Sequence, residues 1–320
     1  FGIGSLPAHG VLAGEHAHRQ RRRRRGLSVP RVDTFVVLAV LFGALLHAGW
    51  NTLVKSSGDM QLDLVLVHAL GAVAAIPLVV VIGLPPPAAW PFVAASLCVH
   101  VAYYVTLNGA YQHGELGLTY PIMRGSAPLL VALGSGLVLG EQLSLTTWLG
   151  VAGVTAGVLT IGLSRSGGSL QGHRRAIGYA LTNAVMIAAY PFVDGQGARA
   201  STPAGGSPSS SVAPLFVLDG IPYPAWVWWR RSAEQRRAVV AYARRRWPLA
   251  TLGGLASMGS YAIALWAMTR APVAAVSALR ETSVLFAAAL SVLVLKERFG
   301  LQRAAGAAII VAGVVALRLS

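Results

Sequence analysis

Ten apolar runs of about 20 residues follow one another along the chain and leave it few ways to fold. A helix that crosses the hydrocarbon core of a bilayer needs about 20 mostly apolar residues. The runs lie near 34–54, 63–84, 90–111, 118–140, 146–164, 176–194, 211–229, 248–269, 272–295 and 301–318. The seventh run is the weakest, because Asp219, Pro222 and Pro224 interrupt it. The sequence therefore predicts an all-α, polytopic membrane protein with ten transmembrane helices.

The charge distribution agrees with this class. Only 12% of the 320 residues are charged, against about 25% in a soluble domain. The net charge is +15, but seven of the 26 basic residues precede Asp33 and seven more lie between Arg230 and Arg246. Membrane proteins flank their helices with basic residues in this way. No folded basic face is apparent, so we expect no nucleic-acid partner.

The chain divides into two halves with related sequences. Sliding Thr119–Ser164 onto Ala275–Ser320 gives 16 identities in 46 positions without a gap, where composition alone would give about five. Each half has an odd number of spans, so the second half would be inserted upside down, as in many secondary transporters. The predicted units are a basic, disordered tail (1–33), a five-helix repeat (34–164), a polar linker (165–175) and a second five-helix repeat (176–320).

Two of the matched residues are arginines inside apolar runs, Arg124 and Arg280. An arginine at such a depth costs about 2.5–3.5 kcal/mol even on the lenient insertion scale. By helix rise each lies roughly 6–8 Å from the midplane, and inversion puts them on opposite sides of it. Together they would suit a carboxylate or a phosphate, which guanidinium groups bind in a fork. The alternative is that Arg124 pairs with Glu281 as a structural or gating pair and touches no ligand.

Polar and aromatic residues on other runs indicate the wall of a cavity near these arginines. His47 and Asn51 are four residues apart and therefore share one helix face. His47 could carry a proton, although a lone histidine is more often only hydrogen-bonded. The complete predicted substrate-binding set is Arg124, Arg280, His47, Asn51, Tyr103, Tyr104, Asn108, Tyr120, Tyr190, Tyr261 and Trp266, with Glu281 and Asp194 as gating or charge-pairing residues.

Enzyme chemistry has no support in the sequence. It contains no His/Cys cluster with metal-ligand spacing, no phosphate-binding P-loop and no Gly-x-Ser-x-Gly elbow. We therefore predict no catalytic residue, no metal and no cofactor. The stretches GVAGVTAG and GAAIIVAG place small residues on shared faces, where helices can pack closely either within one chain or in a homodimer.

Four stretches carry a resemblance to a known family: LHAGWNTLVK, YYVTLNGAYQHGELGLTYPIMRGSAPLL, AYPFVDGQGAR and LWAMTRAPVAAVSALRETSVLFAAALSVLVLKE. With them, residues 34–320 resemble the EamA-like branch of the drug/metabolite transporter superfamily. The resemblance implies ten helices, an inverted repeat and secondary transport by alternating access. Small multidrug pumps of the superfamily carry a glutamate in the first span, whereas this chain has His47 and no acid there.

The expected function is therefore transport of a small polar metabolite, anionic or zwitterionic, across the bilayer by a multi-pass protein of the bacterial inner (plasma) membrane. A proton or an exchanged counter-substrate would be the coupling partner. The alternatives are a membrane-embedded enzyme, a lipid-head-group handling protein or an assembly subunit that transports nothing.

Membrane orientation stays open at this point. The resemblance suggests that both termini are cytoplasmic, but that topology puts fourteen basic residues of the body on the opposite side and only Arg199, Arg270 and Arg318 with the termini. Positive-inside bias favours the reverse. A re-entrant seventh span would return Arg230–Arg246 to the cytoplasm and break the repeat.

Overall fold

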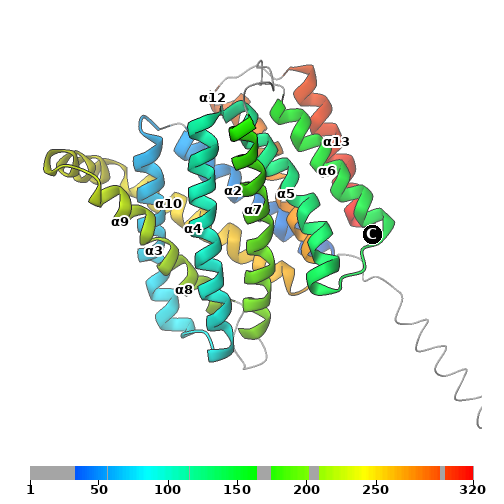
Figure 1. The fold of residues 1–320 in the computed structure, drawn as a ribbon, viewed down its shortest axis with the longest axis horizontal. Coiled ribbons are helices and arrows are strands. Elements are labelled where there is room, and N and C mark those ends of the chain that lie inside the picture. The colour runs from blue at the N-terminus through cyan, green and yellow to red at the C-terminus, as the bar shows by residue number, and fades with distance from the viewer. Residues whose placement is uncertain are drawn as a thin grey trace, which may run out of the picture.

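A computed structural model describes residues 33–55, 57–114, 116–163, 174–201, 209–295 and 300–319, and these ranges contain helices but no strand. The N-terminal tail and most of the 165–175 linker lie outside the described residues. The helices are α2 (Thr34–Lys55), α3 (Met60–Ile82), the short η1 (Pro87–Ala89), α4 (Trp90–His113), α5 (Leu116–Leu139), α6 (Leu145–Leu163), α7 (Arg174–Ser201), α8 (Ser209–Asp219), α9 (Pro222–Trp229), α10 (Ala233–Met268), α11 (Val273–Arg280), α12 (Ser283–Leu295) and α13 (Leu301–Leu319). Figure 1 shows them as one helical bundle.

Nine segments in the described ranges are long and apolar enough to cross a membrane, and the stretch Val273–Leu290, which joins α11 to most of α12, counts as one of them. The exception is the predicted seventh span, which the structure divides into α8 and α9. The chain breaks at Gly220 and Ile221, and Pro222 begins α9 at a position where its missing N–H costs no helical hydrogen bond.

The two ends of the bundle differ in charge. Arg318, near the end of α13, donates a hydrogen bond to the hydroxyl of Thr34, so the start of α2 and the end of α13 lie together at what we call the terminal end. The 22 residues of α2 span about 33 Å and lead to the start of α3 at the other end. Arg231 binds Gln61 there, with 2.9 Å between Nη2 and Oε1. We call this the basic end, because the seven arginines between Arg230 and Arg246 lie on this side.

The broken pair of helices runs along α3 rather than turning back. Gly220 packs so closely on α3 that an added Cβ would lie 2.4 Å from the Cβ of Ala72. α9 then continues toward Gln61, at the first turn of α3. A re-entrant seventh span is therefore not what the structure has, and the disagreement between loop charge and family resemblance over orientation stands.

The basic segment between the seventh and eighth runs is helical, so the eighth helix begins well before residue 248, where its apolar run starts. α10 begins at Ala233, after a capping box in which Ser232 and Gln235 each bind the other's backbone N–H. Further along, Asp63 on α3 receives hydrogen bonds from Tyr242 (2.9 Å) and Arg246 (2.6 Å). The capped, anchored segment projects with α9 from the side of the bundle (Figure 1).

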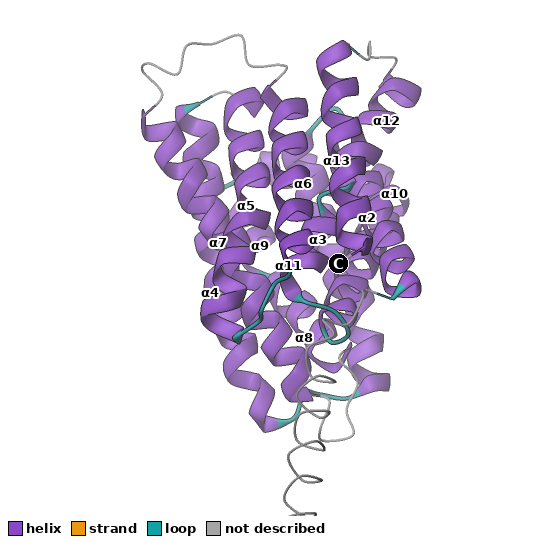
Figure 2. Ribbon diagram, turned by 90° about the vertical axis from the view of Figure 1, so that its right-hand side faces the viewer, coloured by secondary structure: helices purple, strands orange, loops and turns teal. Residues whose placement is uncertain are grey.

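The helices pack as pairs around a buried centre. α6 lies along α13, α4 along α7, α2 along α10, and α5 between α6 and α7; Figure 2 shows α6 beside α13 from a second direction. α11 lies at the centre of the main core, where its residues Val273 to Leu279 are all buried. Asn183 joins α7 to α4 by donating to the backbone oxygen of Tyr103 at 2.8 Å and to Thr106 Oγ1 at 2.9 Å.

Small residues explain the tight packing of α6 on α13. A Cβ added to Gly157 would lie 2.7 Å from the carbonyl oxygen of Gly306, and one added to Gly313 would lie 2.8 Å from that of Gly150. The obstacles are backbone atoms, which cannot rotate away as a side chain can. The GVAGVTAG and GAAIIVAG stretches therefore pack against each other within this chain, and the packing of these faces gives no support to a homodimer.

We predict that Gly157→Ala destabilises the protein, because the added methyl group forces two helices apart. Overpacking of this kind costs about 1–3 kcal/mol, so the melting temperature in detergent should fall by several degrees. Gly178→Ala is the matched control: Gly178 is also helical, yet its added Cβ would meet no atom within 4 Å. Equal melting temperatures for the two variants would contradict this account of the interface.

Candidate functional site

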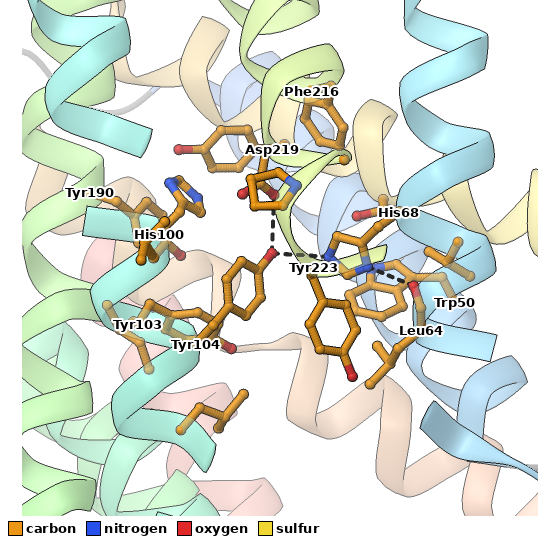
Figure 3. A pocket seen from close by; sticks show the side chains of 18 of the residues that line it. Trp50, Leu64, His68, His100, Tyr103, Tyr104, Tyr190, Phe216, Asp219 and Tyr223 are labelled. Atoms are coloured by element: carbon orange, nitrogen blue, oxygen red, sulfur yellow. Dashed lines mark hydrogen bonds between the residues drawn. The ribbon is translucent and has the colours of Figure 1, made fainter. Parts of the chain in front are cut away.

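A cavity of about 940 Å³ lies between the two halves of the chain. Its wall is mostly aromatic and apolar, with few charged groups. The lining side chains that carry rings, charge or hydrogen-bonding groups are His47, Trp50, Gln61, His68, His100, Tyr103, Tyr104, Asn108, Tyr111, Arg124, Tyr190, Phe216, Asp219, Tyr223, Trp226, Ser257, Ser260, Tyr261 and Arg280. Figure 3 shows many of the rings facing one another across the space. Such a mixture suits a small ligand with an apolar body and a few polar atoms.

The cavity extends from the centre of the bundle toward the basic end. At its inner limit it is lined by Arg280, the last residue of α11. At its outer limit it is lined by Met60 and Gln61 in the first turn of α3 and by Tyr111 in the last turn of α4. These two helix ends both belong to the basic end, so the cavity faces the side opposite the termini.

A break between α11 and α12 produces the ion pair at the inner limit. The helix stops at Arg280, and the backbone turns at Glu281 and Thr282 before α12 begins. Glu281 is buried there, with its Oε1 3.0 Å from Arg124 Nη2. In the first half the position equivalent to Glu281 is Gly125, and α5 continues through it without a break. The two matched arginines therefore have different surroundings: Arg124 has a carboxylate partner.

Arg280 is the less neutralised of the two arginines. Its guanidinium carbon lies 5.9 Å from the ring centre of Tyr190 and 5.3 Å from that of Tyr261. Its Nη1 is 3.3 Å from the Tyr190 hydroxyl. Within the described ranges Arg280 forms no ion pair with a carboxylate. Aromatic faces stabilise a cation without cancelling its charge, so Arg280 presents a positive charge to the cavity.

Most of the predicted site residues lie in the cavity wall, and three do not. Those in the wall are Arg124, Arg280, His47, Tyr103, Tyr104, Asn108, Tyr190 and Tyr261. Asn51 instead donates to the backbone oxygen of His47 at 2.7 Å. Tyr120 is 39% exposed and is not one of the lining residues. Trp266 packs edge-on against Phe35, with ring centres 5.7 Å apart, and so lies toward the terminal end.

A hydrogen-bonded network in the wall was not predicted. The hydroxyl of Tyr104 on α4 lies 3.1 Å from Nε2 of His68 on α3 and 3.0 Å from Oδ2 of Asp219 at the end of α8 (Figure 3). The ring of Tyr223 stacks on that of Tyr104, with 5.8 Å between centres. The sequence does contain a signal, since an ionisable residue inside an apolar run indicates function by default. Asp219 and His68 both satisfy it, but Asp219 was treated only as an interruption of the seventh run.

The predicted charge-pairing residue Asp194 lies on the terminal-end side of the cavity and is not one of its lining residues. The hydroxyl of Tyr261, which lines the cavity, donates to Asp194 Oδ2, and Asp194 itself is buried. Leu215 and Leu265 pack beside this pair. Together these residues separate the cavity from the terminal end.

A second polar cluster joins four elements at the terminal end. Glu141, in the loop after α5, accepts a hydrogen bond from the Val273 backbone N–H at 3.1 Å, which caps the start of α11. Arg199 at the end of α7 lies 3.9 Å from Glu141 and donates to the Met268 backbone oxygen at 3.1 Å. Burial raises the pKa of the Glu141 carboxyl above its ordinary value, while the Val273 N–H and Arg199 act in the opposite direction. This cluster ties α7, α10 and α11 together on the side away from the cavity.

Comparison with known proteins identifies the kind of protein to which this site belongs. No curated protein matches the chain. Among solved structures 28 chains match; one crystal structure, of a protein described no further, covers 89% of this chain and 96% of its own with a TM-score of 0.66 and 18% identity. At that identity the likeness concerns the fold alone. The family model for the EamA-like transporter family matches residues 174–319.

That family lies within the drug/metabolite transporter superfamily, and its members are membrane transporters, which favours a non-enzymatic role. The matched residues comprise α7 to α13, including Tyr190, Asp219, Tyr261, Arg280 and Glu281 of the site just described. The match covers slightly less than half of the chain, and it shows that residues 174–319 are similar to the EamA-like transporter family.

Proposed function

We propose that the protein is a secondary transporter that moves a small anionic or zwitterionic metabolite by alternating access, with its binding site between two five-helix repeats near the midplane. The observation that carries the proposal is the position of Arg280 at the inner limit of an aromatic-lined cavity, without a carboxylate partner in the described part of the chain. A half-buried cation inside an apolar bundle requires compensation, and a carboxylate, phosphate or sulfonate would provide it.

Unpaired donors in the wall favour the same class of substrate. Among the described residues, Trp50 Nε1 and Arg124 Nε are buried without a hydrogen-bond partner, and both residues line the cavity. Neither group can accept a hydrogen bond. An acceptor-rich ligand would satisfy them, and the surrounding rings would contact its apolar part.

The pairing of helices supports an inverted repeat of ten spans, with α8 and α9 together as the seventh. If each helix is replaced by its counterpart in the other half, the pair α4–α7 becomes α10–α2, and the pair α5–α7 becomes α12–α2. In the structure the two helices of each of these four pairs pack against each other. The pairing of α6 with α13 maps onto itself. A two-fold relation between halves would generate this pattern.

The distribution of polar contacts supports alternating access. The cavity faces the basic end, while Asp194 with Tyr261 and the Glu141–Arg199 cluster close the terminal end. We infer that this is one of two related states, and that the other would expose the site by loosening these terminal-end contacts. Inverted-repeat transporters operate by such an exchange between two faces.

We predict that Arg280→Gln weakens binding of aromatic anions at least about tenfold, because a charge-assisted hydrogen bond contributes about 1.5–3 kcal/mol. The measurement is thermal stabilisation of purified protein by benzenesulfonate, an aromatic anion, and by L-phenylalanine, a zwitterion. Benzyltrimethylammonium tests whether any aromatic ion suffices. The control is Arg270→Gln, because Arg270 is exposed in the turn after α10 and its guanidinium carbon lies 4.6 Å from the centre of the Trp266 ring, outside the cavity. Benzenesulfonate binding that survives in Arg280→Gln would refute the assignment.

We also predict opposite effects of Glu281→Gln on stability and on anion binding. The change leaves Arg124 buried without its carboxylate, which costs about 3–5 kcal/mol and should lower the melting temperature. The freed guanidinium should then bind benzenesulfonate more tightly than in the wild type. The double variant Arg124→Gln/Glu281→Gln removes both charges and should recover much of the lost stability while losing the gain in affinity. A double variant less stable than Glu281→Gln alone would contradict the pairing.

A further inference from the structure

The network of His68, Tyr104 and Asp219 has one hydrogen bond more than its ordinary protonation state can supply. His68 Nδ1 lies 2.8 Å from the backbone oxygen of Leu64, and a carbonyl oxygen can only accept, so Nδ1 carries a proton. In a neutral imidazole Nε2 is then an acceptor. Tyr104 lies between this acceptor and the carboxylate of Asp219, at 3.1 and 3.0 Å. Its single hydroxyl proton can serve only one of the two contacts.

One additional proton satisfies both contacts. On His68 Nε2 it gives an imidazolium that donates to Tyr104 Oη, which in turn donates to the Asp219 carboxylate. On Asp219 it gives a carboxylic acid that donates to Tyr104 Oη, which in turn donates to His68 Nε2. Either arrangement raises the charge of the network from −1 to 0. In this part-buried site, a neutral and fully bonded network costs less than one with a net charge and a missing hydrogen bond.

From this geometry we propose that the network of His68, Tyr104 and Asp219 is a binding site for one exchangeable proton that couples the transport cycle to the proton gradient. The proposal rests on the proposed transport function and adds the coupling ion to it. It assigns the proton to this network rather than to His47, which the sequence suggested. His47 lies edge-on against Trp50, with ring centres 5.3 Å apart, and no carboxylate is bonded to it in the described ranges.

The network joins helices of both halves, so binding or release of a proton would change how the two halves are held together. His68 and Tyr104 belong to α3 and α4 of the first half, and Asp219 belongs to α8 of the second. With the extra proton, Tyr104 is bonded to α3 and α8 together. Without it, one of these two links is lost. Because Tyr104 also lines the cavity and stacks on Tyr223, the protonation state would change both the contact between halves and the surface that meets the substrate.

Other titratable or charged groups face the same cavity from every neighbouring element. They are His47 on α2, His100, Tyr103 and Tyr111 on α4, Arg124 on α5, Tyr190 on α7, Tyr223 on α9, Tyr261 on α10 and Arg280 on α11. None of them is hydrogen-bonded to His68, Tyr104 or Asp219. An anionic substrate near Arg280 and a proton on the network would therefore occupy separate parts of one cavity, as a coupled pair requires.

Asp219→Asn is the variant that isolates proton binding. The asparagine amide can donate to Tyr104 Oη, which can then donate to His68 Nε2, so every contact is satisfied without an added proton. The variant imitates the protonated network and cannot release a proton. Glu234→Gln is the matched control, because it also replaces a carboxylate by its amide, but Glu234 is exposed in the first turn of α10 and does not line the cavity.

The first test uses purified protein alone. In infrared difference spectra between acidic and alkaline pH, we expect the wild type and Glu234→Gln to gain a carboxylic-acid band or an imidazolium band that Asp219→Asn lacks. The absence of any band that depends on Asp219 would overturn the proposal. This outcome is independent of whether a substrate has been identified, so it separates failure of the proton site from failure of the transport function.

The second test uses proteoliposomes and radiolabelled benzenesulfonate, which does not itself titrate near neutral pH. For the wild type and Glu234→Gln, an imposed pH gradient should shift the final accumulation several-fold in one direction. Asp219→Asn should still exchange labelled for unlabelled benzenesulfonate but should accumulate it equally with and without the gradient. Wild-type exchange that ignores the gradient, or an Asp219→Asn variant that responds like the wild type, would overturn proton coupling while leaving transport intact. Complete absence of exchange by the wild type would count against the proposed function, and the infrared test would still decide the proton site.

Discussion

The buried ion pair between Arg124 and Glu281 is the constraint on which the centre of this structure depends. An unpaired charge inside an apolar bundle is expensive, and here each charge is supplied by a different half of the chain. The pair can form only where α5 lies against α11 and where the backbone breaks after Arg280. The halves are thus held in register by a contact that neither could make alone. Because Arg124 Nε and Glu281 Oε2 have no partner among the described residues, the pair retains unused bonding capacity.

The broken helices concentrate the chemistry of the protein at two places. The break between α8 and α9 follows Asp219, and the break between α11 and α12 falls at Arg280 and Glu281. Helix ends leave backbone groups unsatisfied, and in a membrane such ends are tolerated only inside protein or beside a polar cavity. Asp219 and Arg280 both line the cavity. Both breaks belong to the second half of the chain. The polar site in this apolar bundle therefore depends on a difference between the two related halves.

Sequence reasoning succeeded where a strong periodic or energetic signal exists. Apolar length predicts the nine long spans, and the cost of burying charge draws attention to Arg124 and Arg280. It failed at the start of α10, because a basic helix anchored by Asp63 has the composition of a solvated loop. It also overstated the symmetry of the arginines, since the partner of Arg124 is a glutamate for which the first half has Gly125. Asn51 and Trp266 were also expected in the site, but Asn51 bonds to the backbone of its own helix and Trp266 packs against Phe35, contacts that the linear pattern does not indicate.

The network around Tyr104 illustrates what a linear pattern cannot reveal. His68, Tyr104 and Asp219 lie on three different spans, and only the packing of α8 against α3 brings the carboxylate and the imidazole to opposite sides of one hydroxyl. Each residue alone has an ordinary explanation as a hydrogen-bonded polar group. Their juxtaposition changes the argument, because two acceptors compete for the one proton of the Tyr104 hydroxyl. In the proposed proton site, the added proton would let Tyr104 bond to both halves at once, and such a difference between two states is what a coupling ion needs in order to bias one conformation over another.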